Sequence, residues 1–367
     1  MKLYLSIALL FFLTEVTGQV HCQYPKNNDK RIENAVSFYK EYLDEFNNRG
    51  TPNYRDYWSE IDCKRRKIPD PIAFSISSEV PLYSFITEKT IFSVEVNATV
   101  VHLKTLFSVV DSLDNVTVFA ITNHYIQSSD KGDALHFISP LEINKSNIQT
   151  TRNHNIRYHY PKSIVFDKSK SDAMLLQIRN FEKEWGFEPI DFDYFFAETQ
   201  KNLAAMRGLD YVIGMQQNVP SGISFPDDKL IYCSGYGEGY FHEVLHLYLN
   251  PLYEKSPINH GMIYYLAGSI GYTFDELINR MNSYLLEYPE TNLSNFEKLE
   301  TRDNRLNIYN VITGLVAKIV YEKEGVSGLQ RILKYKTMDE VFKSEFELEK
   351  KEWDSFLRSI LKKYKTN

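Results

Sequence analysis

The sequence predicts an α+β protein with two domains. The N-terminal domain consists of a helix and an antiparallel sheet, and the second domain consists of a small sheet followed by a mostly helical C-terminal lobe. Three observations support this fold class. Residues 29–47 repeat apolar side chains at helical spacing, residues 72–160 hold β-branched and aromatic segments between polar turns, and the chain after Gly239 is almost wholly helical in pattern. With 367 residues and 43% hydrophobic residues, the chain can bury two cores.

The first helix is expected over residues 29–47, where the apolar residues share one face and Gly50 follows as a terminator. Three strand-like segments come next, at residues 91–94, 116–119 and 156–160. Because they are separated by polar turns, we expect them in one antiparallel sheet. This N-terminal domain contains no constellation of catalytic groups, and its scattered histidines are expected to be structural or exposed.

A second domain is expected to begin near Pro161, which divides the mature chain into residues 19–160 and 161–367. Its first helix should end at Gly186, and its first strand, with one buried face, should span residues 190–194. The further elements expected before the long helical region are a helix at 198–207, strands at 211–215 and 230–233, and a glycine-rich approach at 234–239.

The first 18 residues resemble a secretory signal peptide. Lys2 supplies a positive charge, Leu3 to Leu13 form an apolar run, and Val16-Thr17-Gly18 offers a cleavage site. A membrane anchor is the alternative, but the run is short for a spanning helix. We therefore expect a secreted or periplasmic protein whose mature chain has no membrane span.

The charge of the chain bears on its binding partners, and its cysteines bear on disulfide pairing. The net charge is −6 and no basic stripe is present, so a nucleic-acid partner is not expected. The cysteines are Cys22, Cys63 and Cys233, without metal-ligand spacing. Cys22 and Cys63 could pair in an oxidising compartment, which would leave Cys233 as a buried thiol. The sequence assigns no oligomeric state.

The strongest chemical signal is His242-Glu243-Val244-Leu245-His246. Residues four apart lie on the same face of a helix, so both imidazoles can bind one zinc ion. Glu243 projects beside the ion and can act as a general base toward a water that the metal activates. The alternative is a pair of packing histidines.

A zinc site of this kind needs a third protein ligand. After residue 160 the only histidines are His242, His246 and His260, all in one short window. Asn250-Pro251 is expected to end the first helix, and a second helix from about Ile258 to Gly268 would carry His260 in its first turn. The other candidate ligands are Glu254, Asp275 and Glu276, although Glu276 fits a capping box with Thr273.

Residues 231–333 resemble the gluzincin metallopeptidases, in particular small secreted bacterial proteins with a peptidase-MA-like domain. The resemblance lies in the strand, the glycine-rich approach, the His-Glu-x-x-His helix, the short loop and the second helix. In the family that second helix begins with Glu-Gly and its Glu is the third zinc ligand; here His260-Gly261 stands at this position. The resemblance also implies an oxyanion-stabilising role for Tyr309, and the segment 321–325 resembles the last core helix of the family.

These features together predict a secreted, zinc-dependent peptidase acting on a peptide or protein substrate, with Glu243 as general base and Tyr309 as a donor to the oxyanion. The strand 230–233 either pairs with the extended substrate or lies inside a sheet. The alternative function is a catalytically inactive, secreted binding or scaffold protein that retains the metal site. The two differ in whether the carboxylate of Glu243 is needed.

Overall fold

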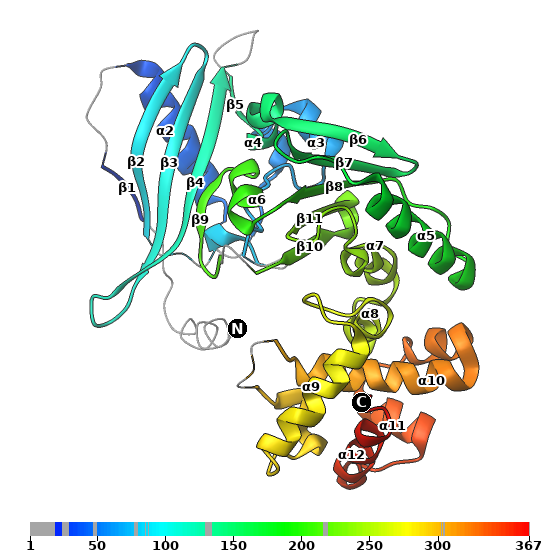
Figure 1. Ribbon diagram of the computed structural model, residues 1–367. Helices are drawn as coiled ribbons and strands as arrows, with labels where there is room; N and C mark the ends of the chain where they lie inside the picture. The colour runs from blue at the N-terminus through cyan, green and yellow to red at the C-terminus, as the bar shows by residue number, and fades with distance from the viewer. Residues whose placement is uncertain are drawn as a thin grey trace. The chain divides into compact units, whose positions relative to one another are not determined.

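The computed structural model describes residues 19–23, 29–46, 50–76, 80–84, 86, 88–128, 134–215, 219–301, 303 and 305–366. It is a mixed α+β structure with two mixed sheets and a helical C-terminal region, which confirms the predicted fold class (Figure 1). The predicted signal peptide over residues 1–18 lies outside the described residues.

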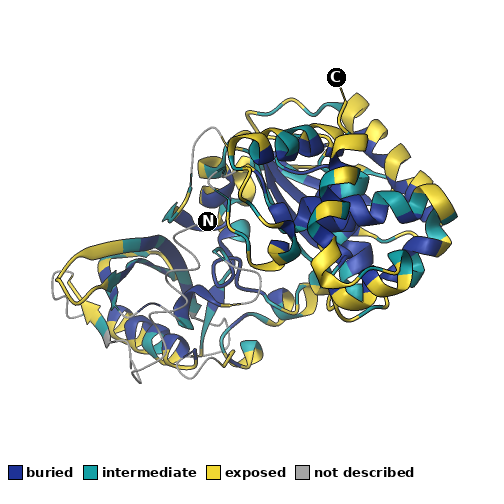
Figure 2. Cartoon of the chain, turned by 90° about the horizontal axis from the view of Figure 1, so that it is seen from below, coloured by how far each residue is buried: buried dark blue, intermediate teal, exposed yellow. Residues whose placement is uncertain are grey.

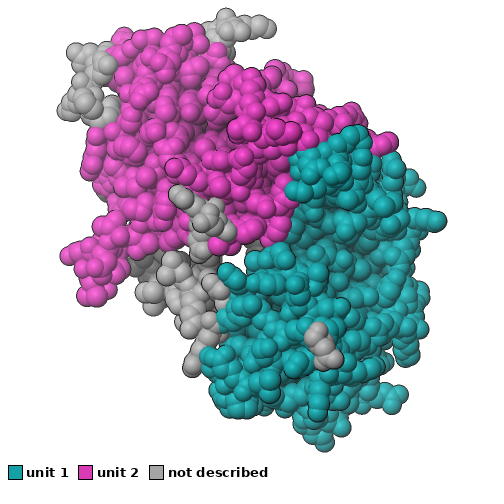
Figure 3. Space-filling model, in the orientation of Figure 1, with its two compact units in different colours: residues 1, 167–192, 238–367 teal, residues 2–166, 193–237 magenta. Residues whose placement is uncertain are grey.

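The chain divides into two compact units, coloured separately in Figure 3. Unit 1 contains Asp167–Phe192 and Glu238–Asn367, and unit 2 contains Lys2–Phe166 and Asp193–Gly237. Because residues 193–237 belong to the same unit as the N-terminal residues, the chain passes between the units three times. The division into domains at 19–160 and 161–367 stays a prediction.

The first sheet of unit 2 runs in the order β1-β2-β3-β4-β5, and β9 pairs with β4. β1 and β2 are parallel, and the other pairs are antiparallel. Register shifts interrupt the β2–β3 and β3–β4 ladders, and such irregularities bend strands and increase their twist. The strands are β1 (Gln19–Cys22), β2 (Glu88–Asn97), β3 (Val100–Val110), β4 (Val116–Ser128), β5 (Leu135–Ile138) and β9 (Leu209–Val212).

The helix predicted over residues 29–47 is present as α2 (Lys30–Asp44), and it packs against this sheet. The side chain of Asp29 caps its first turn, and apolar residues at helical spacing, such as Tyr39 and Leu43, are fully buried. In Figure 2 the buried side of α2 faces the sheet and its exposed residues lie on the other side. The core between them is rich in aromatic rings, including Tyr42, Phe107 and Phe137.

The second sheet of unit 2 runs in the order β10-β11-β8-β7-β6. Two predictions are corrected here. The segment 156–160 was expected in the first sheet, but as β7 it pairs in the second. Residues 190–194 were expected to be a half-buried strand, but the strand is β8, whose residues after Asp193 are all buried. The strands are β6 (Ile148–Asn153), β7 (Ile156–Pro161), β8 (Phe192–Ala197), β10 (Ser221–Phe225) and β11 (Leu230–Ser234).

Strand β11 contains the segment 230–233, which the sequence left as either an internal strand or a substrate-pairing strand. It pairs in parallel with β8 on one side and antiparallel with β10 on the other. The strand is therefore internal, and its backbone is not available for strand addition. Short helices complete unit 2: α3 (Glu60–Arg65), α4 (Pro140–Ile143) and α6 (Gln200–Met206).

Unit 1 is helical, in agreement with the pattern after Gly239. Helix α5 ends at Gly186, which has φ +71°, as the sequence predicts for a helix stopped by glycine. Helix α9 begins with the expected capping box of Thr273 and Glu276. The helices are α5 (Lys168–Trp185), α7 (Phe241–Tyr253), α8 (Asn259–Ala267), α9 (Phe274–Glu287), α10 (Ile308–Ile332), α11 (Met338–Phe346) and α12 (Trp353–Lys363).

Two further expectations can be compared with the fold. Among the described residues, no helix is long and apolar enough to cross a membrane. No disulfide joins the three cysteines: Cys22 is exposed, Cys63 is half-buried and Cys233 is buried, so Cys22 and Cys63 are not paired in this structure.

Candidate metal centre

Helix α7 presents the first two histidines. Its apolar residues, among them Val244, Leu245 and Leu249, are fully buried and hold the helix in unit 1. The helix was expected to end at Asn250-Pro251, but it continues through Pro251 to Tyr253. Proline has no backbone N–H, so the last turn of α7 lacks the hydrogen bond that residue 251 would otherwise donate to the preceding turn.

Helix α8 presents the third histidine and begins at Asn259, close to the predicted start. His260 lies in its first turn, and the next residue, Gly261, lies against α10. A Cβ atom on Gly261 would lie 1.9 Å from Thr313 Oγ1 and 2.6 Å from the backbone nitrogen of Gly314. Only a residue without a side chain allows the two helices to approach this closely, so Gly261 helps to fix the position of His260.

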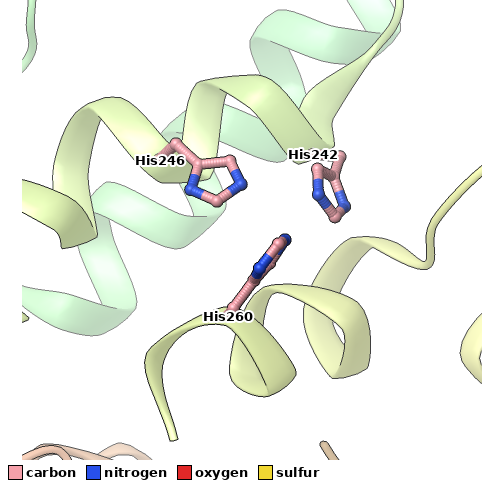
Figure 4. Close-up of side chains that lie close together, drawn as sticks. All are labelled: His242, His246 and His260. Atoms are coloured by element: carbon pink, nitrogen blue, oxygen red, sulfur yellow. The ribbon is translucent and has the colours of Figure 1, made fainter. Parts of the chain in front are cut away.

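The three imidazoles meet between α7 and α8 (Figure 4). One nitrogen from each of His242, His246 and His260 lies within 4.8 Å of the other two. The ring centroids are 5.2 Å apart for His242 and His246, 5.9 Å for His242 and His260, and 5.1 Å for His246 and His260. Tetrahedral zinc with bonds of about 2.0–2.1 Å places its nitrogen ligands about 3.3 Å apart, so small side-chain rotations suffice to close the site on an ion.

Two hydrogen bonds orient the histidines of α7. His242 Nδ1 donates to the carbonyl oxygen of Gly268 at 2.6 Å, and His246 Nδ1 donates to Asn250 Oδ1 at 3.1 Å. Each acceptor assigns the proton to Nδ1, which leaves the lone pair of Nε2 for a metal. Asn259 Nδ2 also donates to Asn250 Oδ1, at 2.9 Å, and so connects α8 to the same group.

The backbone at Gly268 supports this orientation. Gly268 has φ +69°, and a Cβ atom there would lie 2.0 Å from the carbonyl oxygen of Tyr272. A side chain is excluded by this contact, and the conformation itself favours glycine. Gly268 therefore ends α8 in a way that brings its carbonyl oxygen to His242.

The environment keeps the three imidazoles neutral. Burial, with repulsion from His246, lowers the pKa of His242 to about 3, and burial also lowers the pKa of His246. His260 has an exposed edge, yet the packing around its ring and the proximity of His246 lower its pKa to about 4. Neutral imidazole is the form that binds a metal, so no proton has to leave these rings at neutral pH.

The predicted catalytic residues lie on the same helices or beside them. Glu243 follows His242 in the first turn of α7 and is buried. Tyr309 lies in the first turn of α10, where its hydroxyl donates to the carbonyl oxygen of Pro257 at 2.7 Å, just before α8. Burial raises the pKa of Tyr309 to about 12, so its hydroxyl is protonated and can act as a donor.

Of the other candidate ligands, Glu254 is the exposed C-cap residue of α7, and the remaining two have structural partners. Glu276 accepts from Thr273 in the capping box, and Asp275 forms an ion pair with Lys318. Among the described residues, His242, His246 and His260 form the single group of three or more side chains that could hold a metal.

The sequence did not single out the groups that orient the ligands. Asn250 was interpreted only as a helix end, although it lies four residues after His246 and therefore on the same helix face. That spacing could have identified it. Gly268 acts through its backbone carbonyl, which carries no side-chain signal.

Comparison of the chain with protein-family models, with curated proteins and with solved structures gave no match in any of the three. The resemblance to gluzincins therefore stays a prediction drawn from the motif.

Proposed function

We propose that this protein is a zinc-dependent peptidase whose metal is held by His242, His246 and His260. The observation that carries the proposal is the convergence of three neutral imidazoles, two from α7 and one from α8, with Glu243 directly after His242 on α7. Three histidines are a known ligand set of catalytic zinc, which keeps a fourth position open for water or substrate. Imidazole also suits copper and nickel, so the metal has to be identified by measurement.

The chemistry divides between the ion and the chain. A bound zinc ion would supply Lewis-acid chemistry, polarising the scissile carbonyl and acidifying a water molecule. Glu243 takes the proton from the attacking water and returns it to the leaving amine. The low-dielectric surroundings of Glu243 strengthen its interaction with the reacting groups. Tyr309 donates to the developing oxyanion, which requires its hydroxyl to leave the carbonyl of Pro257.

A third histidine in place of the carboxylate expected from the gluzincin resemblance changes the charge of the site. A neutral imidazole leaves the site one unit more positive than a carboxylate would. This difference favours further acidification of a water at the site. A hydrolase with His260 as ligand is therefore chemically sound.

The second candidate function is a metal-retaining binding protein without hydrolysis. The bond of the Tyr309 hydroxyl to Pro257 favours it, because a group engaged in the fold is not available as an oxyanion donor. The two functions differ at Glu243, since hydrolysis needs its carboxylate and metal retention does not.

The deciding experiment compares metal content and peptide hydrolysis for wild type and Glu243→Gln, using protein that starts at Gln19. The matched control is Glu254→Gln, an exposed residue after the last turn of α7 that loses the same charge. We expect one zinc per chain in all three proteins and a loss of at least a hundredfold in hydrolysis for Glu243→Gln alone, on the order of a removed general base.

Other results would change the conclusion. Zinc without hydrolysis of a broad peptide library, in wild type as in the variants, would establish the binding protein. No zinc after reconstitution would refute both functions. We further propose, from the predicted signal peptide, that the protein acts outside the cytoplasm; amino-terminal sequencing of exported protein should find a start near Gln19.

A further inference from the structure

Unit 2 contains a second candidate site that shares no residue with the metal centre. It is a cavity of about 440 Å³, a size suited to a small molecule. Its walls come from α3 and the loop after it, from α4 and the turn after it, and from strands β6, β7 and β8. All of these segments belong to unit 2.

The alternation of β7 and β8 brings charged side chains to this cavity. In β7, Ile156, Tyr158 and Tyr160 are buried, whereas Arg157 and His159 between them point to the other face and line the cavity. Asp193 of the neighbouring strand lines it as well. The polar face of the second sheet thus forms the floor of the cavity.

The cavity carries more positive than negative charge. Its lining includes four side chains that are always cationic at neutral pH, and three carboxyl groups. Burial also raises the pKa of Asp62, one of these carboxyls, which favours its neutral form. In a chain of net charge −6, this local excess is the reverse of the overall balance. The cations are Arg65, Arg66, Lys145 and Arg157.

The excess is concentrated around Asp193. Arg157 Nε lies 2.9 Å and His159 Nε2 lies 2.8 Å from Asp193 Oδ1. Arg66 Nη2 lies 3.6 Å from Asp193 Oδ2, which is too long for a hydrogen bond. One carboxylate therefore faces two guanidinium groups and an imidazole.

Arg66 has the least compensated charge in the lining. Its side chain is 14% exposed, and its guanidinium lies over the ring of Phe195 at 5.6 Å. Its Nη1 atom is buried and has no hydrogen-bond partner among the described residues. A buried donor left without an acceptor is costly, and a small rotation of the guanidinium would turn its donors toward an acceptor in the cavity.

We propose that this cavity binds a small organic anion through a carboxylate or phosphate group, held by Arg66 and Arg157. Guanidinium groups present paired donors that match both kinds of oxyanion. Arg65 and Lys145 are more exposed and share the carboxylate of Glu142, so together they leave one net positive charge at the rim that can attract the anion. Thr150, whose Oγ1 lies 3.0 Å from His159 Nδ1, holds the imidazole in place beside Asp193.

The test is isothermal titration calorimetry of the full chain with inorganic phosphate and with succinate, at constant ionic strength set by sodium chloride. The variants are Arg157→Ala and Arg65→Ala, which remove exposed cations and so spare the fold. The matched control is Lys64→Ala, which removes an exposed, ion-paired cation from the same helix as Arg65 but does not line the cavity. Circular dichroism checks that each variant is folded.

We expect saturable binding of one anion per chain to wild type and to Lys64→Ala. Arg157→Ala should bind at least tenfold more weakly, and Arg65→Ala several-fold more weakly, as expected for lost charge-assisted contacts. Tighter binding of phosphate or of succinate would support the proposal and identify the oxyanion. No saturable binding of either probe up to about 10 mM, or equal weakening by Lys64→Ala, would overturn it.

Discussion

Replacing Gly261 with alanine tests whether close packing of two helices positions His260, the third candidate metal ligand. The added methyl group would lie 1.9 Å from Thr313 Oγ1. That hydroxyl cannot move freely, because it donates to the carbonyl oxygen of Tyr309 at 2.8 Å. An ordinary contact needs about 3.4 Å, so α8 and α10 must separate locally by about 1.5 Å.

The magnitude follows from this displacement. Overpacking of a buried contact costs about 1–3 kcal/mol, and the nearby backbone of Gly314 places this site in the upper part of that range. His260 precedes Gly261 directly and moves with it. Because metal–ligand distances tolerate only about 0.2 Å, we expect zinc affinity to fall at least tenfold.

Two measurements check the prediction on the same protein. Urea unfolding in the presence of a chelator gives the free energy of unfolding, and competition with a chromophoric chelator gives the zinc affinity. The control is Gly239→Ala, because a Cβ atom at Gly239 would meet no atom within 4 Å. If Gly261→Ala kept both the stability and the zinc affinity of Gly239→Ala, the packing argument would be wrong.

Three further predictions follow from single contacts. Asn250→Ala removes the acceptor of His246 and should lower zinc affinity about tenfold or more with the fold intact, as measured by chelator competition and circular dichroism. Tyr248→Phe removes a donor from the buried carboxylate of Glu182 and should lower the free energy of unfolding in urea by about 1–3 kcal/mol. The control is Tyr321→Phe, whose partner Glu184 is exposed, and this change should alter the free energy of unfolding by less than about 0.5 kcal/mol. Burial lowers the pKa of His124 from 6.5 to about 3 in the folded protein. As the pH falls from 6.5 toward 3, the unfolded chain therefore takes up a proton that folded His124 does not, and the free energy of unfolding decreases. Between pH 7 and pH 5, the free energy of unfolding measured with urea should therefore decrease by about 2 kcal/mol less in His124→Gln than in wild type. An identical pH dependence of the two proteins would show that His124 is not responsible.

The sequence predicts where the helices and strands of this fold lie along the chain better than it predicts which strands pair with one another. Helices α2 and α5 were predictable because their apolar spacing and their terminal residues, Asp29 and Gly186, are local signals. Pairing is not local. The alternation of β7 identifies a strand, but nothing in it tells which sheet receives the strand. Likewise β9, expected with the later strands, pairs with β4 of the first sheet.

The convergence of the candidate metal ligands was predictable for a similar reason. His242 and His246 are one helical turn apart, so their convergence needs only the helix itself. The convergence of His260 depends on a loop and on the packing of α8, and it was predicted from the clustering of histidines and from the gluzincin resemblance. The hydrogen bond between His242 and the carbonyl oxygen of Gly268 depends on how α7 and the end of α8 pack together, and the sequence pattern does not predict it.

The bridging amide of Asn250 has a consequence for how the candidate site would take up a metal ion. Asn250 accepts from the imidazole of one ligand helix and from Asn259 of the other, so the chain itself holds the two helices in register. The cost of ordering the ligands is met during folding, and loading requires no refolding of the chain. In the proposed peptidase, zinc should therefore exchange reversibly with solution, and removal of zinc by a chelator should abolish activity that added zinc then restores.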